Sequence, residues 1–172
     1  KEVIDRSLVQ NIWLVNVGTQ KDTSAKAVEI AEKYNEGVYA AIGLHPIHTE
    51  KSHHDPQELG ETEGLAPRAR SDFSGFPSRG EQFDYDYYKK LGENPKVVAI
   101  GECGLDYYRL GKSTKESQGK AFLVQIKLSS ELKKPLMIHC RNAYDDLITI
   151  LRDQKSLLHS PAGIIHFFSG AK

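Results

Sequence analysis

Short, almost wholly apolar segments alternate with amphipathic segments along this chain, and this alternation limits the folds open to it. The apolar segments lie at residues 12–18, 38–44, 97–102, 135–140 and 163–168. Strands buried on both faces have this composition, and helices between them carry the chain back, so the pattern predicts a parallel sheet covered by helices. Periodicity alone does not separate a closed barrel from an open, doubly wound sheet.

Polar residues stand where four of these segments end: Glu102, His139, His166 and His45. The carboxyl ends of parallel strands lie on one rim of a sheet, so we expect these side chains to meet there. Imidazole nitrogens and carboxylate oxygens are common ligands of divalent metals. The sequence therefore favours a metal-dependent hydrolase.

Side chains alternate between the two faces of a strand, which predicts the neighbours of the candidate ligands. Glu102 should share a face with Ile100, and His139 should share a face with Met137. The two cysteines next to these ligands should then point toward the covering helices as packing thiols; they are Cys103 and Cys140.

The amphipathic segments predict helices at residues 22–37 and 113–134, with others at residues 1–10 and after residue 142. In the segment 113–134, the apolar spacing is three, four and four, which places one side of the helix against the sheet. The residues with this spacing are Ala121, Val124, Leu128 and Leu132.

Residues 49–93 lack a sustained apolar period and are rich in Gly, Pro, Ser and charge. They leave the strand that ends at His45, so we expect a rim insertion or lid whose second half forms a short helix. Aromatic side chains in this stretch could stack on bases or anchor the insertion, and anchoring is the favoured interpretation. They are Phe73, Phe76, Phe83, Tyr85, Tyr87 and Tyr88.

Composition limits the cellular location and the binding partners that we expect for this chain. The 172 residues suit one domain, and no apolar run approaches the roughly 20 residues that span a bilayer, so we expect no membrane association. Two cysteines fit a reducing compartment, which predicts a cytoplasmic protein, and a monomer is favoured. With 23 basic and 23 acidic residues, no global positive field steers the chain onto nucleic acid. Contact with nucleic acid must therefore be local.

Four strings occur in an order and over a span that resemble the TatD family of metal-dependent deoxyribonucleases, within the amidohydrolase-like group of barrel hydrolases. They are AIGLHP at 41–46, VAIGECGLDYY at 98–108, PLMIHCR at 135–141 and IIHFFSG at 164–170. Each string alone is weak. Together they make the resemblance specific.

The resemblance implies a (β/α)8 TIM barrel that holds two divalent ions and hydrolyses DNA. It implies that Glu102 bridges the metals, that His139 and His166 are further ligands, and that His45 and Arg141 lie near the substrate phosphate. The family's His-x-His motif on the first strand and its metal-binding aspartate on a late strand have no counterpart here. A TIM barrel needs about 250 residues, and only five strands are visible, so we expect residues 1–172 to be one partial barrel domain of a longer polypeptide.

The residues themselves leave alternatives open. Arg141 could grip phosphate through two parallel hydrogen bonds or form a salt bridge with Asp106 or Asp145. Asp106 could orient a ligand from behind or cap a turn. Four histidines in polar sequence are expected to be solvated: His48, His53, His54 and His159.

The leading hypothesis is hydrolysis of phosphodiester bonds in DNA, from an end and on single strands, with Mg²⁺, Mn²⁺ or Zn²⁺ at the site and Glu102 central to catalysis. The same barrel and ligands could instead hydrolyse an amide, lactone or ester of a small molecule. A third interpretation is a non-catalytic fragment, in which the three ligands bind metal loosely.

Overall fold

The computed structural model describes residues 1–53, 77–108, 111–158, 160–168 and 170. Its main sheet has five strands, which the sequence predicted: β1 (Leu14–Val17), β2 (Val38–Ile42), β5 (Val97–Asp106), β6 (Leu136–Arg141) and β7 (Gly163–Ile165). The helices are α1 (Glu2–Val9), α2 (Lys21–Glu32), α3 (Tyr85–Gly92), α4 (Lys115–Leu132) and α5 (Tyr144–Asp153). A separate pair of strands is formed by β3 (Lys51–His53) and β4 (Pro77–Arg79).

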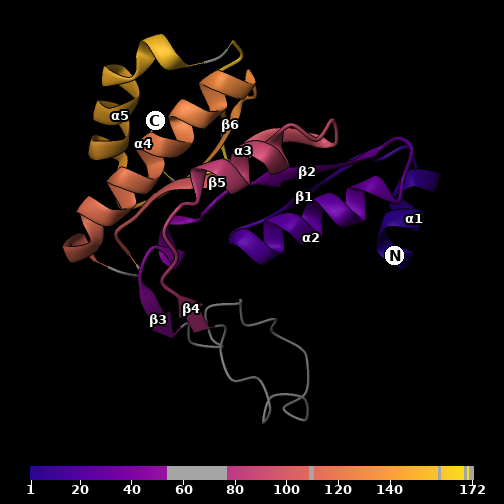
Figure 1. The fold of residues 1–172 in the computed structure, drawn as a ribbon, viewed down its shortest axis with the longest axis horizontal. Coiled ribbons are helices and arrows are strands. Elements are labelled where there is room, and N and C mark those ends of the chain that lie inside the picture. Colours follow the sequence, from indigo (N-terminus) through magenta and orange to yellow (C-terminus); the bar gives the residue numbers. More distant parts are fainter. Residues whose placement is uncertain (54–76, 109–110, 159, 169, 171–172) are drawn as a thin grey trace.

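The strands of the main sheet follow one another in chain order, β1-β2-β5-β6-β7, and every pair is parallel. Right-handed crossovers that always step in one direction place all helices on the same face. Buried residues of α2, α3, α4 and α5 indeed share one core cluster with the strands, and Figure 1 shows these helices along the sheet. An open doubly wound sheet reverses its strand order, so this arrangement is the wall of a barrel.

The two faces of the sheet differ in what they bury. The helix side holds the large core, which includes Cys103 and Cys140, so the prediction that both are packing thiols is confirmed. Burial raises the pKa of both thiols. The opposite face carries a small cluster formed by Ala41, Ala99 and Met137. This second face is the one that would line a barrel interior.

The predicted pairing of Ile100 with Glu102 on one face is wrong. Ile100 lies in the helix-side core, whereas Ala99 belongs to the opposite cluster. The register between β5 and β6 shifts between Gly101 and Cys103, so two residues oppose one there. Such a bulge resets the alternation of side chains. It turns Glu102 toward His139 even though Ile100 faces the helices.

The buried face of α4 matches the predicted one only at Leu128, which is fully buried, and Leu132, which packs against the core. Ala121 and Val124 are only half-buried, while Phe122 and Ile126 are fully buried. Three polar side chains share this face, and they are Gln118, Gln125 and Ser129. Apolar spacing cannot detect a helix face on which amides take the place of aliphatic groups.

The stretch 49–93 contains β3, β4 and α3 within its described residues, and α3 confirms the expected short helix. Its aromatic residues hold α3 on the core: Tyr88 is 1% exposed, and Phe83 stacks on it at a centroid distance of 4.3 Å. Tyr85 and Tyr87 pack against the same core. Anchoring is therefore confirmed for these four residues, whereas Phe73 and Phe76 lie outside the described residues.

Figure 1 shows the β3–β4 pair projecting from one end of the main sheet. Within the part of the chain that the structure describes, no helix combines the length and the apolar character that a bilayer span requires.

Candidate metal site

Two imidazoles converge on one carboxylate oxygen at the carboxyl ends of the strands. His139 Nδ1 lies 3.2 Å from Glu102 Oε1, and His166 Nδ1 lies 3.1 Å from the same oxygen. His139 comes from β6 and Glu102 from β5, while His166 directly follows β7. The structure thus brings together three of the predicted site residues from three neighbouring strands.

His45 is the fourth member of this group. Its ring centroid is 4.2 Å from that of His139, and the ligand atoms of His45, Glu102 and His139 all lie within 4.8 Å of one another. It follows β2 after Gly43 and Leu44 and directly precedes the 3₁₀ turn Pro46–His48. Extended backbone at His45 before Pro46 turns the ring back toward the other strands.

The electrostatics of the group favour an ionised carboxylate among imidazoles. Burial would raise the pKa of Glu102, but hydrogen bonds with His139 and His166 and the charge of nearby imidazoles lower it to about 2. Burial would lower the pKa of His139, but Asp106 and Glu102 raise it to about 9. Burial and the neighbouring His139 lower the pKa of His45 to about 3. At neutral pH His45 is therefore uncharged.

The tautomer of His45 follows from one contact. The backbone N–H of Ile47 donates to His45 Nδ1 over 3.3 Å. A neutral imidazole whose Nδ1 accepts a hydrogen bond carries its proton on Nε2. His45 then presents a hydrogen-bond donor, whereas a metal ligand needs a free lone pair.

Asp106 makes the contacts that both of its alternatives require. Its Oδ2 lies 2.8 Å from His139 Nε2, and its Oδ1 accepts the Tyr108 backbone N–H over 2.9 Å. The guanidinium of Arg141 lies over the ring of Tyr108, with its central carbon 3.8 Å from the ring centroid. Arg141 is thus held at the rim by a cation–π contact.

The prediction that His48 is solvated is wrong. His48 is 6% exposed, and the side-chain amide nitrogen of Gln20 lies 3.0 Å from its Nδ1. The 3₁₀ turn after His45 folds His48 inward, which the polar sequence around it does not reveal. His54 and His159 lie outside the described residues, as does the side chain of His53.

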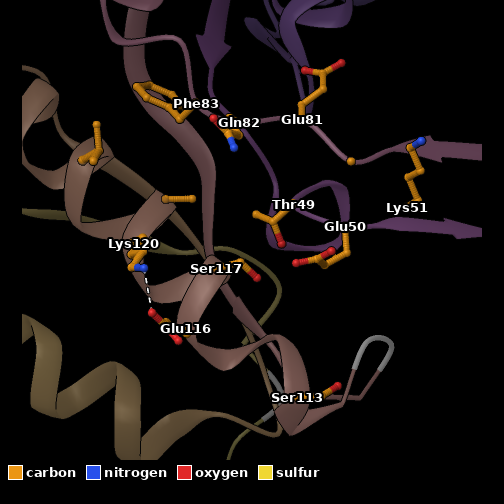
Figure 2. A pocket seen from close by; sticks show the side chains of 13 residues that line it. Thr49, Glu50, Lys51, Glu81, Gln82, Phe83, Ser113, Glu116, Ser117 and Lys120 are labelled. Atoms are coloured by element: carbon orange, nitrogen blue, oxygen red, sulfur yellow. Dashed lines mark hydrogen bonds and ion pairs between the residues drawn. The ribbon is translucent and has the colours of Figure 1, made fainter.

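A pocket of about 960 Å³ lies elsewhere, between α4 and residues 49–51 and 80–83 (Figure 2). Carboxylates and amines are mixed on its walls, where Glu116 pairs with Lys120. None of His45, Glu102 and His139 lines it. The histidine cluster is the candidate for metal chemistry, because two imidazoles converge there on one carboxylate oxygen, whereas this pocket mixes carboxylates with amines.

The donor set of the cluster fits a divalent metal. It contains an ionised carboxylate whose side chain is 12% exposed and two imidazoles directed at it. A buried carboxylate is costly unless it is paired or binds a cation. Mixed nitrogen and oxygen donors suit Zn²⁺ or Mn²⁺, while Mg²⁺ prefers oxygen.

Two residues that hold backbone segments next to this site were absent from the predicted set. Gln118 and Gln125 of α4 are fully buried and hydrogen-bond to the backbone of Asp106 and Leu44. The signal that could have revealed them is the spacing of seven residues, which places two amides on the helix face that also carries Phe122 and Ile126.

The family model described as "TatD related DNase" matches residues 1–172. Among curated proteins, the chain is 34% identical over 172 residues to "Uncharacterized metal-dependent hydrolase YabD" of Bacillus subtilis, covering 99% of this chain and 55% of that protein. It is 32% identical over 161 residues to "3'-5' ssDNA/RNA exonuclease TatD" of Edwardsiella piscicida, covering 92% and 49%. The chain spans about half the length of the curated relatives it matches.

Solved structures give the same picture of the fold. A hydrolase TatD family protein from Entamoeba histolytica aligns with a TM-score of 0.67 at 28% identity, covering 98% of this chain and 49% of that one. YJJV, a TatD homolog from Escherichia coli, aligns with a TM-score of 0.61 at 26% identity, covering 92% and 49%. The predicted fold class and family resemblance are confirmed.

Proposed function

Because this chain belongs to the family of TatD-related DNases, whose members include metal-dependent hydrolases, we propose that it hydrolyses phosphodiester bonds of DNA, acting on single strands from an end. The observation that carries the proposal is the convergence of His139 and His166 on Glu102 at the strand ends. Relatives named as 3'-5' exonucleases of single-stranded DNA and RNA support this substrate class.

We assign Glu102, His139 and His166 to the metal and His45 and Arg141 to the substrate phosphate. Two divalent ions held here would activate water as the nucleophile and stabilise charge on the phosphoryl oxygens. Glu102 offers an ionised oxygen to them. Asp106 orients His139 from behind.

His45 and Arg141 suit the substrate role. The Nε2–H of His45 can donate to a phosphoryl oxygen, since its Nδ1 accepts from Ile47. Arg141 supplies positive charge, and Tyr108 beneath it is 54% exposed, which leaves ring surface on which a terminal base can stack. A local cationic and aromatic rim meets the requirement that nucleic-acid contact in a neutral chain be local.

The test is cleavage of a 3'-labelled or 5'-labelled single-stranded oligonucleotide with added Mn²⁺, beside RNA and a panel of esters, lactones and amides. We expect DNA cleavage that Glu102→Gln abolishes. Glu116→Gln is the matched control, because it makes the same change in the 960 Å³ pocket, and it should retain the wild-type rate. DNA cleavage by Glu102→Gln at the wild-type rate, or hydrolysis of the small molecules without cleavage of DNA, would contradict the proposal.

The role of His45 has its own test. His45→Ala should lower kcat/KM by about 10-fold to 100-fold, the range expected for one hydrogen bond to a charged group, and leave Mn²⁺ affinity unchanged. Loss of Mn²⁺ binding by this variant would instead make His45 a ligand. A monomeric state and a cytoplasmic location remain our predictions.

A further inference from the structure

The ladder between β2 and β5 ends before either strand reaches the site. The last paired residues are Ile42 and Ile100, yet β5 continues to Asp106, and the chain after β2 continues through Leu44 to His45. Beyond that point the backbone donors and acceptors on the facing edges of the two segments lose their strand partners, although the other edge of β5 still pairs with β6. Buried groups of this kind need replacements, because an unpaired buried peptide group costs about 1–3 kcal/mol.

Two amides of α4 supply the replacements. Gln118 Oε1 accepts the Asp106 N–H over 2.7 Å, and Gln118 Nε2 donates to the Asp106 carbonyl over 2.9 Å. Gln125 makes the equivalent pair with Leu44, at 2.9 and 3.0 Å. The side-chain amide carries N–H donors and a C=O acceptor, so each glutamine satisfies both the N–H and the C=O of a single residue. The amide nitrogen also donates to Thr114 Oγ1 in Gln118 and to the Ala121 carbonyl in Gln125.

The two glutamines differ in what lies beyond the backbone they hold. Asp106, which Gln118 holds, contacts Nε2 of His139, and His139 contacts Glu102. Leu44, which Gln125 holds, precedes His45, whose Nδ1 is engaged by Ile47. Only Gln118 is therefore linked to a group that we assign to the metal.

We propose that Gln118 is a positioning residue for the metal site: it fixes the Asp106 backbone so that the Asp106 carboxylate holds the His139 ring toward Glu102. The proposal rests on the proposed function for the assignment of His139 as a ligand. Residues that orient a ligating histidine typically change metal affinity by about 10-fold to 100-fold when they are replaced.

Mn²⁺ binding to the purified protein, followed by the electron paramagnetic resonance of free Mn²⁺, tests this without any substrate. Gln118→Met keeps the length of the side chain and removes its hydrogen bonds to the Asp106 backbone and to Thr114 Oγ1. It should weaken Mn²⁺ binding by about 10-fold to 100-fold. Gln118→Glu keeps the acceptor and loses the donor, so its Mn²⁺ affinity should lie between those of Gln118→Met and the wild type. This variant also tests the proposal if Gln118→Met does not fold.

Two matched controls separate positioning from general damage. Gln125→Met loses the same pair of buried hydrogen bonds on the same helix. Ser129→Ala loses a buried hydrogen bond to the Lys134 carbonyl, at the end of the sheet where β6 begins. Both variants should bind Mn²⁺ with the affinity of the wild type, even where urea unfolding shows that they lose as much stability as Gln118→Met.

Wild-type Mn²⁺ affinity in both folded Gln118 variants would overturn the positioning role, and so would an equal loss in Gln118→Met and Gln125→Met. Wild-type protein that binds Mn²⁺ without cleaving DNA would remove the proposed function and leave this inference intact. Wild-type protein that binds no Mn²⁺ would overturn both.

Discussion

The pH dependence of metal binding can be worked out from the contacts of His139. Asp106 and Glu102 raise its pKa to about 9, so in the metal-free protein at pH 7 only about one molecule in 100 carries a neutral His139. A metal ligand must be deprotonated. The apparent Mn²⁺ affinity at pH 7 should therefore be about 100-fold below its limit, and should rise about tenfold per pH unit up to pH 9.

His45 and Glu102 do not disturb this window. The pKa values of His45 and Glu102 are lowered to about 3 and about 2, so neither binds a proton that must be displaced above pH 7. Titration calorimetry in two buffers of different ionisation enthalpy should show release of about one proton per site at pH 7 from His139.

Asp106→Asn provides the control, because it removes the charge that most strongly holds the proton on His139. The pH at which the affinity levels off should move down in this variant. Mn²⁺ affinity that stays constant from pH 7 to 9 in the wild-type protein, with no proton released, would refute the reasoning.

Three further outcomes follow from burial and backbone geometry. Phe122→Ala should lower the free energy of unfolding by about 3–5 kcal/mol, measured in urea, while Leu123→Ala, which is 40% exposed in the wild type, should change it little. Gly104→Ala should lower the free energy of unfolding by at least about 1–3 kcal/mol and weaken Mn²⁺ binding, since a Cβ at Gly104, where φ is +133°, would lie 2.1 Å from the His139 carbonyl oxygen. Gly119→Ala should be neutral or stabilising, because the space around Gly119 is open. A larger loss of stability in Gly119→Ala than in Gly104→Ala would contradict this prediction. The metal-free protein should lose stability as pH falls from 6.5 toward 3, and His45 should contribute at most about 1.4 kcal/mol per pH unit to this loss. The reason is that the pKa of His45 is lowered in the folded protein, so the unfolded chain binds the proton first. A free energy of unfolding that urea titration finds unchanged between pH 7 and 5 would count against this.

The strands and the rim that they share were predictable from local pattern. Apolar segments followed directly by Glu102, His139 and His166 imply parallel strands with ligands at their carboxyl ends. The structure has His139 and His166 near the ends of β6 and β7, whereas β5 continues past Glu102 to Asp106. This succeeds because strand direction and topology decide which rim a residue occupies, whatever the details of packing.

Three features depended on tertiary structure. The register shift at Gly101–Cys103 cancelled the simple alternation and turned Glu102 away from the face of Ile100. A 3₁₀ turn buried His48 although its sequence is polar. The sequence alone suggests that Gln118 is a solvated helix residue. Its role depends on β5 extending beyond the last residue that pairs with β2, which leaves the Asp106 N–H to be accepted by Gln118.

The sequence by itself determined which residues reach the rim, because a strand's composition and its last residue are local properties. Only the tertiary structure decided how they face one another: which nitrogen of His45 accepts a hydrogen bond, and which side chain holds Asp106 behind His139. Those contacts join segments far apart in the chain, and no local pattern records the orientation of one segment against another.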